Sequence, residues 1–401
     1  MDTRTPEFDL LLKGGHVIDP TQNVDGPLDV AVRGNIIADV SRDIPEVRAK
    51  KPIDVRGLYV TPGIIDLHVH VFPGRGPAVS PDALAVRSGV TTMVDAGSAG
   101  WRNFEEFKST IIDVSKTRIL ALLNIAGCGM TVREQDLAEM DPIAAAEMIE
   151  RYPEDIVGLK SAHYSGAYFE SIDHAVHAGR LSRTPVMVDF WVKATATHED
   201  LLLKHLRPGD MHTHFYARQF PLLNEDGQVQ DYVWRARERG VLFDVGHGSG
   251  SFWFRIAVPA VKQGFVPDSI STDLHKNSAL LPAATMDVTM SKFLNMGMTL
   301  QDVIMRATAN PARQIQRPEL GTLSVGAPAD VAVFALREGE FGFIDSGGAR
   351  MRGKRRLDCQ MTIRNGEVLW DANGLSRPDW EASGDYDYID LDPLPRHDWP
   401  A

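Results

Sequence analysis

The sequence predicts a (β/α)8 barrel of the TIM type, joined to a small β-sandwich that both ends of the chain build together. Between residues 63 and 275, short apolar runs alternate with helical stretches. Eight such runs over about 250 residues are typical of this barrel. The two ends of the chain carry short strand patterns separated by turns instead. We therefore predict a barrel over 61–317 and a discontinuous β-sandwich over 1–60 and 318–401.

The β-sandwich prediction depends on matching patterns at the two ends. Residues 8–19 read FDLLLKGGHVID, and PLDVAVRGNIIADVS and PIDVRGLYVTPG follow. Late in the chain, GAPADVAVFAL and CQMTIRNGEVLWDANG show the same alternation of apolar positions. Asn365 and Gly366 stand between two strand-like runs, which predicts a hairpin. The acidic tail over 377–401 is expected to be either an irregular segment packed on the surface or disordered.

The barrel prediction rests on strand and helix candidates that alternate along the chain. The strand candidates are Gly63–His70, Thr91–Gly97, Arg118–Gly127, Asp155–His163, Pro185–Trp191, Asp210–Tyr216, Val241–Gly248 and Ser269–His275. Helical candidates include Asn103–Ser115, Pro142–Tyr152, Ser171–Gly179, His198–Leu206 and Asp231–Arg239. A doubly wound open sheet is the alternative. No glycine-rich dinucleotide fingerprint follows an early strand, which favours the barrel.

Composition narrows the class of protein. The formal net charge is −12, so the basic patch of a nucleic-acid or anionic-membrane surface is not expected. The chain has two cysteines and no CxxC motif, which favours reduced thiols and a cytoplasmic location. No signal-peptide pattern is seen, and no apolar run approaches the ~18 residues of a spanning helix. The expected partner is a small-molecule substrate, and a homo-oligomer stays open.

The chemistry begins at PGIIDLHVHVFPG, residues 62–74. His68 and His70 are two residues apart, so on a strand their side chains point to the same face. Two imidazoles side by side at the end of a buried strand favour a metal site, because an unpaired buried imidazole is costly. The alternative is a half-buried strand with two incidental histidines.

Other reactive side chains stand at later strand ends, where barrel active sites form. They are Lys160, His214, His247 and Asp273. Taken singly, Lys160 reads best as a snorkelling lysine and Asp273 as a turn residue. An ammonium cannot ligate a cation, but a carbamylated lysine could. His247, in a glycine-rich turn, is a candidate for substrate contact or a hydrogen-bonded turn histidine. His163, His174, His177, His198 and His205 are expected to be surface or structural residues.

Taken together, these residues resemble the amidohydrolase superfamily over essentially the whole chain. The stretches that carry the resemblance are TPGIIDLHVH, VTTMVDAGSAG, RPGDMHTHFY, FDVGHGSGSFWF and STD at 271–273, with Lys160. Within the superfamily, the chain looks most like the deacetylase or dihydroorotase-like group.

The resemblance implies a centre of two divalent ions, usually zinc, with manganese or iron as alternatives. His68 and His70 would hold one ion with Asp273. Lys160, carbamylated by carbon dioxide, would bridge both ions, and His214 would help to hold the second. Such a pair of ions lowers the pKa of a shared water to about 7. Asp273 would then act as the catalytic base and acid.

Two departures from the family pattern bear on the second ion and on the substrate. Asp189 stands where the family usually has a histidine; it is either a ligand or a partner that orients one. Phe72 stands where dihydroorotases have a substrate-binding arginine, and Arg75 either takes that role or faces solvent. We expect hydrolysis of an amide or ester of a small acylated acid. A cyclic-amide hydrolase and a catalytically silent binding protein are the alternatives.

Overall fold

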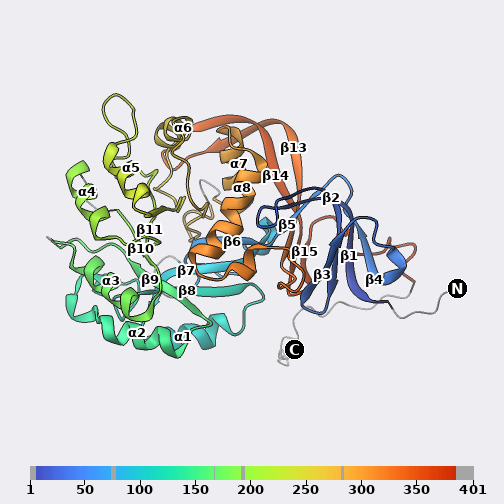
Figure 1. Ribbon diagram of the computed structural model, residues 1–401, viewed down its shortest axis with the longest axis horizontal. Coiled ribbons are helices and arrows are strands. Elements are labelled where there is room, and N and C mark those ends of the chain that lie inside the picture. Colours follow the sequence, from blue (N-terminus) through green and yellow to red (C-terminus); the bar gives the residue numbers. More distant parts are fainter. Residues whose placement is uncertain (1–5, 74–77, 167, 191–194, 281–283, 385–401) are drawn as a thin grey trace, which may run out of the picture.

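The structure is a computed structural model that describes residues 6–73, 78–166, 168–190, 195–280 and 284–384. It has two sheets (Figure 1). One is parallel and curled, with helices around it, and the other lies beside it and contains the strands of both chain ends. Within the described residues, no helix is both long and apolar enough to cross a membrane.

The curled sheet has seven parallel strands in the order β12-β11-β10-β9-β8-β7-β6. In chain order they are β6 (Ile64–Val69), β7 (Val90–Gly100), β8 (Arg118–Asn124), β9 (Ile156–Ser161), β10 (Val186–Val188), β11 (Met211–His212) and β12 (Leu242–Phe243). Each of the first seven predicted strand runs therefore coincides with a strand, and β7 extends beyond its predicted run at both ends. Successive neighbours are joined by parallel pairing, which requires a crossover connection between each pair of strands.

The eighth predicted strand run closes the barrel through isolated bridges. Ser269 bridges to Asp244 beyond β12, and Leu274 bridges to Val69 on β6. Between these bridges, the backbone nitrogen of Thr272 donates to Asp66 Oδ1 at 2.9 Å. The carboxylate of Asp66, on β6, thus binds one backbone donor of this segment. The result is a TIM-like barrel.

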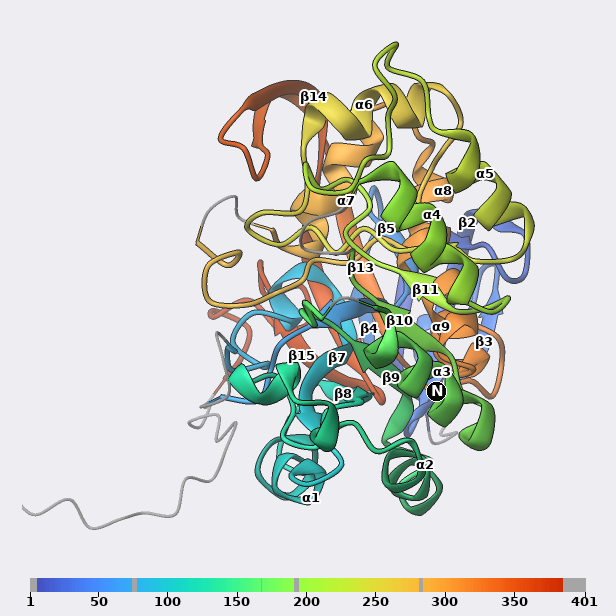
Figure 2. The same ribbon diagram turned by 90° about the vertical axis from the view of Figure 1, so that its left-hand side faces the viewer.

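Nine helices lie in the described part of the chain. They are α1 (Phe104–Phe107), α2 (Pro142–Arg151), α3 (Glu170–Ser182), α4 (Ala196–His205), α5 (Asp231–Glu238), α6 (Phe254–Lys262), α7 (Met286–Asn295), α8 (Leu300–Ala307) and α9 (Ala309–Gln314). All five predicted helices are present, and α1 continues as a π-helical turn over Lys108–Ile112. The start of α2 shows the local cause: Asp141 caps Ile143 and Ala144, and proline occupies the first helical position. Figure 2 shows α1 to α5 outside the strands.

The second sheet joins the two ends of the chain. Its strands are β1 (Phe8–Asp19), β2 (Val24–Arg33), β3 (Ile36–Ser41), β4 (Ala49–Asp54), β5 (Tyr59–Pro62), β13 (Val331–Ile344), β14 (Arg350–Arg364) and β15 (Glu367–Asp371). β5 and β13 pair antiparallel, so the early and late strands share one sheet. Val17, Val60, Val331 and Met361 are fully buried in a common apolar cluster. Asn365 and Gly366 have positive φ between β14 and β15, which confirms the predicted hairpin.

The hairpin of β13 and β14 connects the two sheets. It leaves the terminal sheet and reaches over the barrel toward α6 and α7 (Figure 1). At its tip, Asp345 is buried and accepts a hydrogen bond from the backbone nitrogen of Phe254, at the start of α6, at 3.0 Å. The backbone nitrogen of Ser346 donates to Phe252 O at 2.8 Å. The tip therefore holds the loop that follows β12.

Candidate metal centre

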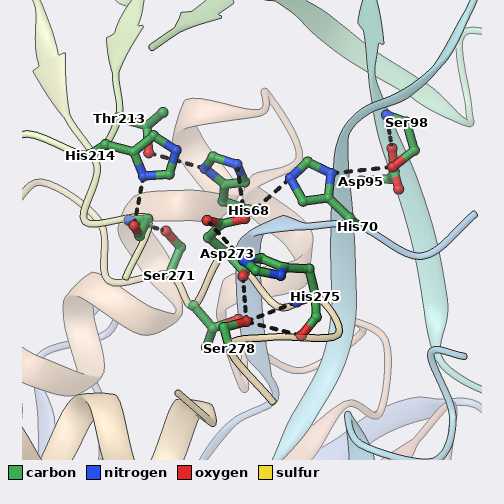
Figure 3. Close-up of polar contacts among 12 residues, drawn as sticks. His68, His70, Asp95, Ser98, Thr213, His214, Ser271, Asp273, His275 and Ser278 are labelled. Carbon is green, nitrogen blue, oxygen red and sulfur yellow. Dashed lines mark hydrogen bonds and ion pairs between the residues drawn. The ribbon is translucent and has the colours of Figure 1, made fainter. Parts of the chain in front are cut away.

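Three side chains predicted as metal ligands meet at the carboxyl-terminal end of the barrel strands (Figure 3). Ligand atoms of His68, His70 and Asp273 all lie within 4.8 Å of one another, and all three residues are buried. His70 Nε2 lies 3.2 Å from Asp273 Oδ1, and His68 Nε2 lies 3.7 Å from the same oxygen. Two imidazole nitrogens and a carboxylate oxygen make a donor set that suits zinc.

The hydrogen bonds of His68 determine which ring nitrogen keeps its lone pair. Thr213 Oγ1 donates its proton to Asp244 Oδ2 at 2.8 Å, so it can only accept from His68 Nδ1, at 3.0 Å. Nδ1 therefore carries the proton, and Nε2, on the side of Asp273, has the free lone pair. Ser269 and Ser271 also donate to Asp244, each at 2.7 Å. This network fixes the ring of His68 from behind, as metal-binding histidines require.

His70 and His214 are oriented in the same manner. Nδ1 of His70 lies 3.2 Å from Ser98 Oγ, which leaves Nε2 facing Asp273. Nδ1 of His214 lies 2.7 Å from the carbonyl oxygen of Gly246, which can only accept, so Nε2 is unprotonated in the neutral ring. Burial lowers the pKa of all three histidines, that of His70 to about 4. They are therefore neutral at pH 7, the form that binds metal.

Asp273 occupies a strained position next to a glycine. Its φ is 47°, in the left-handed region that non-glycine residues rarely adopt. A Cβ atom on Gly248 would lie 2.4 Å from Asp273 Oδ2, so only glycine lets the loop after β12 approach this carboxylate. Burial raises the pKa of Asp273. A dication beside it would oppose that shift by favouring the ionised form.

Lys160 and Asp189 form a buried ion pair beside this triad. Lys160 is fully buried at the end of β9, and its Nζ lies 2.7 Å from Asp189 Oδ1 and 3.4 Å from His68 Nε2. Burial alone would raise the pKa of Asp189, but the charges of Lys160, His214 and His163 outweigh it and lower that pKa. His214 Nε2 lies 3.8 Å from Asp189 Oδ1. The four predicted strand-end residues His68, Lys160, Asp189 and His214 thus lie together.

His247 lies in the same loop as Gly248, but its ring is fully buried. Its Nδ1 donates to Gly248 O at 2.9 Å, and its Nε2 lies 2.6 Å from Nζ of Lys292 on α7. The ring also stacks on Phe252 with 4.5 Å between centroids. Both ring nitrogens are therefore used within the chain, which favours the hydrogen-bonded turn histidine over the substrate contact. Arg75, the other predicted substrate-binding residue, lies outside the described residues.

Sequence reasoning placed His163 among the surface or structural histidines, but it lies beside the site. Its Nδ1 is 3.2 Å from Glu134 Oε2, and its Nε2 is 3.8 Å from Asp189 Oδ2. The hydrogen bond with Glu134, and the charge of Asp189, raise the pKa of His163. Glu134 comes from the loop after β8, and Thr213, Asp244 and Lys292 also went unnoticed as site neighbours. The signal present in the sequence was that His163 is the last residue of the predicted strand run Asp155–His163.

The sequence profile of the amidohydrolase family matches residues 254–369. A deacetylase from Agrobacterium fabrum is 34% identical over 328 residues, which cover 79% of this chain and 80% of the relative. The chain belongs to the amidohydrolase family. A deacetylase from Enterococcus faecalis is 31% identical over 90% of this chain and 99% of its own length. The chain is therefore a deacetylase-like amidohydrolase, as the sequence predicted.

Solved structures agree on the fold. A crystal structure of an adenine deaminase is 29% identical to the chain, with a TM-score of 0.84, and covers 91% of this chain and 100% of its own. A crystal structure of a dihydroorotase is 30% identical to the chain, with a TM-score of 0.79. It covers 90% of this chain and 99% of its own. Sequence matches to proteins named dihydroorotase are shorter: one from Trichlorobacter lovleyi is 38% identical over 21% of this chain.

Proposed function

We propose that the chain is a metal-dependent hydrolase that releases an acyl group, with acetate as the leading case, from an amide or ester of a small acid. The observation that carries the proposal is the meeting of His68, His70 and Asp273 at the strand ends of a deacetylase-like barrel. The barrel, over 61–317, would carry the catalytic groups. The segments 1–60 and 318–401 would support it.

The proposed centre holds two divalent ions, zinc first, with manganese or iron as alternatives. His68, His70 and Asp273 would hold one ion, and His214 and Asp189 would serve the second. Lys160, once carbamylated by carbon dioxide, would provide a carboxylate to both. In the unmodified side chain, the ammonium of Lys160 already offsets the charge of Asp189 at 2.7 Å. Carbamylation would leave two anionic groups there, which only cations can stabilise.

When bound, the ions would supply a water of lowered pKa and polarise the substrate carbonyl. Asp273 would take the proton of the attacking water at a carboxylate oxygen and return it to the leaving nitrogen or oxygen. His68 and His214 would stay neutral because burial lowers their pKa, and Thr213 Oγ1 and Gly246 O would keep their protons on Nδ1. The strained backbone at Asp273 would keep its carboxylate facing His70, which limits reorganisation during proton transfer.

Purified chain should contain about two equivalents of zinc, manganese or iron and should release acetate from N-acetyl or O-acetyl small acids. Asp273→Asn should lower kcat by about 10²- to 10⁴-fold, since the proton-transfer group is lost. Intact-mass measurement under carbon dioxide should show the carbamate on Lys160, and Lys160→Met should lose it. Absence of stoichiometric metal, or an unchanged rate in metal-loaded Asp273→Asn, would favour the silent binding protein.

A cyclic-amide hydrolase is the second candidate, and the similarity to the solved dihydroorotase favours it. Phe72 is buried and packs on Phe107 with 4.9 Å between ring centroids, so it offers a substrate carboxylate no cation. A panel that compares acetate release with ring opening of dihydroorotate, hydantoin and dihydropyrimidine separates the two. Ring opening without acetate release would replace the first candidate with the second.

A further inference from the structure

A cavity of about 670 Å³ lies at the end of the barrel opposite the metal centre. Its lining includes Pro185, Asp210 and Leu242, each at or just before the start of a strand. The candidate ligands follow their strands, so the cavity and the metal centre are at opposite ends of the barrel. Its volume falls in the range of small-molecule sites.

Four arginines and two aspartates line this cavity. The arginines are Arg180, Arg183, Arg207 and Arg313, and the aspartates are Asp210 and Asp268. Asp210 forms an ion pair with Arg207, whose Nε and Nη2 donate hydrogen bonds to its carboxylate at 2.9 and 2.7 Å. Asp268 Oδ2 forms an ion pair with Nη2 of Arg237 at 3.2 Å, and Arg237 is not part of the lining. The same oxygen accepts a hydrogen bond from the backbone nitrogen of Phe243 at 2.8 Å. Neither carboxylate is left to neutralise another cation.

The other three arginines carry uncompensated charge. Across the described ranges, no ion pair is formed by Arg180, Arg183 or Arg313, and the Nη2 of Arg313 donates only to the neutral Asn310 side chain, at 2.6 Å. The chain as a whole has a net charge of −12, so three such guanidinium groups around one cavity are a local reversal of charge. Guanidinium groups bind carboxylates and phosphates in bidentate geometry.

Gln314 is a neutral polar residue in the lining of the same cavity. The residue lines the cavity and is only 8% exposed, yet its Oε1 atom is buried without a hydrogen-bond partner among the described residues. An amide oxygen only accepts hydrogen bonds, so the Nε2 end is the part of this side chain that could donate to an anion.

We propose that this cavity binds a small molecule with at least two carboxylate or phosphate groups. Arg183 and Arg313 would hold two anionic groups, with Arg180 at the rim and the Gln314 amide as a neutral donor. Pro185 leads into β10, whose far end precedes Asp189, and Asp210 leads into β11, which precedes His214. The ligand would therefore contact the first residues of the two strands that position these groups.

Isothermal titration calorimetry of the full chain tests the proposal. Two probes distinguish the anion types: tricarballylate for carboxylates and fructose 1,6-bisphosphate for phosphates. At least one should bind saturably with one site per chain. The double variant Arg183→Gln/Arg313→Gln should weaken binding at least about tenfold, since both charge-assisted contacts are lost. Both positions are exposed, so the variant should keep its fold, which circular dichroism checks.

The matched control is Arg352→Gln, an exposed arginine on β14 far from the cavity lining, which should bind like the unmodified chain. Equal binding by the double variant would place the anion elsewhere, such as at the metal centre, and overturn the proposal. If neither probe binds saturably up to about 10 mM, the proposed anion site is also overturned. The three arginines are then ordinary solvent-exposed surface charges. Because binding is measured directly, the result is independent of the proposed hydrolysis.

Discussion

At the scale of single residues, the centre depends on groups that control which form of each histidine is present. Nδ1 of His68 is bound by Thr213 Oγ1, and Nδ1 of His214 by the carbonyl of Gly246. Each contact leaves Nε2 with a lone pair on the side of the carboxylates. Thr213 is not among the candidate ligands, but its hydroxyl connects His68 to Asp244. Its loss should therefore affect metal binding more than folding.

Thr213→Val should weaken binding of the metal about 10- to 100-fold, because His68 loses the acceptor that fixes its tautomer. Valine keeps the shape of threonine, and Thr213→Ser, which keeps the hydroxyl, is the matched control. Competition with a chromophoric zinc chelator measures the affinity. Equal affinity for the valine and serine variants would contradict the role of the hydroxyl.

Stability of the metal-free chain should fall as the pH falls from 6.5 to about 4. The pKa of His70 is lowered to about 4 by burial, while its ordinary value is 6.5. In this window the unfolded chain binds a proton at His70 that the folded chain does not, so acid favours unfolding. His70 alone should contribute a loss of about 3 kcal/mol across the window. Urea unfolding at several pH values, with His70→Gln for comparison, measures it; identical pH slopes would refute the assignment.

At the scale of elements, the β13–β14 hairpin and α7 together hold the loop after β12. Lys292 on α7 is fully buried, and its Nζ lies 2.6 Å from His247 Nε2 and 2.8 Å from Ile344 O at the end of β13. Burial lowers the pKa of Lys292 to about 7. One side chain thus joins a helix, a hairpin and the loop whose Gly248 contacts Asp273.

Lys292→Met should destabilise the fold by about 1–3 kcal/mol, because His247 Nε2 and Ile344 O both lose their donor in a buried place. Methionine has similar length, so the change removes the polar head with little change of volume. Lys262→Met, at an exposed position on α6, is the control and should stay within about 0.5 kcal/mol of the unmodified chain. Chemical denaturation of the metal-free proteins compares them, and equal losses for both variants would exclude the proposed link.

At the scale of the whole molecule, the barrel and the terminal sheet are connected by a buried polar contact as well as by the hairpin. Arg118, which begins β8, forms an ion pair with Asp330, just before β13. Asp330 is only 1% exposed and also accepts from the backbone nitrogen of Asn365 at 2.9 Å. The carboxylate therefore links a barrel strand, the approach to β13 and the turn between β14 and β15.

Asp330→Ala should cost about 2–3 kcal/mol of unfolding free energy, because a charged hydrogen bond is lost and Arg118 is left partly buried without its partner. Arg118→Met together with Asp330→Ala should cost less than the sum of the two single changes, because the residues interact directly. Denaturant titration of the four proteins completes the cycle. Strict additivity would show that the two residues do not interact.

The sequence by itself determined the elements and the strand-end chemistry. Strand and helix periodicity are local, so the positions of β6 to β12 and of the five predicted helices followed from the residues. The spacing of His68 and His70 fixes a common face, because side chains alternate along a strand. Lys160, Asp189, His214 and Asp273 also followed, since parallel strands of a barrel end on the same side.

Tertiary structure alone decided which groups surround these residues. The hydroxyl of Thr213 contacts both Asp244 and His68. His68 lies 145 residues before Thr213 in the sequence. Lys292 meets His247, His163 turns toward Asp189, and three arginines from α3, its following loop and α9 line one cavity. Such contacts depend on loop paths and on the packing of helices against the barrel. Local periodicity encodes neither loop paths nor helix packing. The hydrogen-bond network behind the candidate metal centre and the cavity at the opposite end therefore form only in the folded chain.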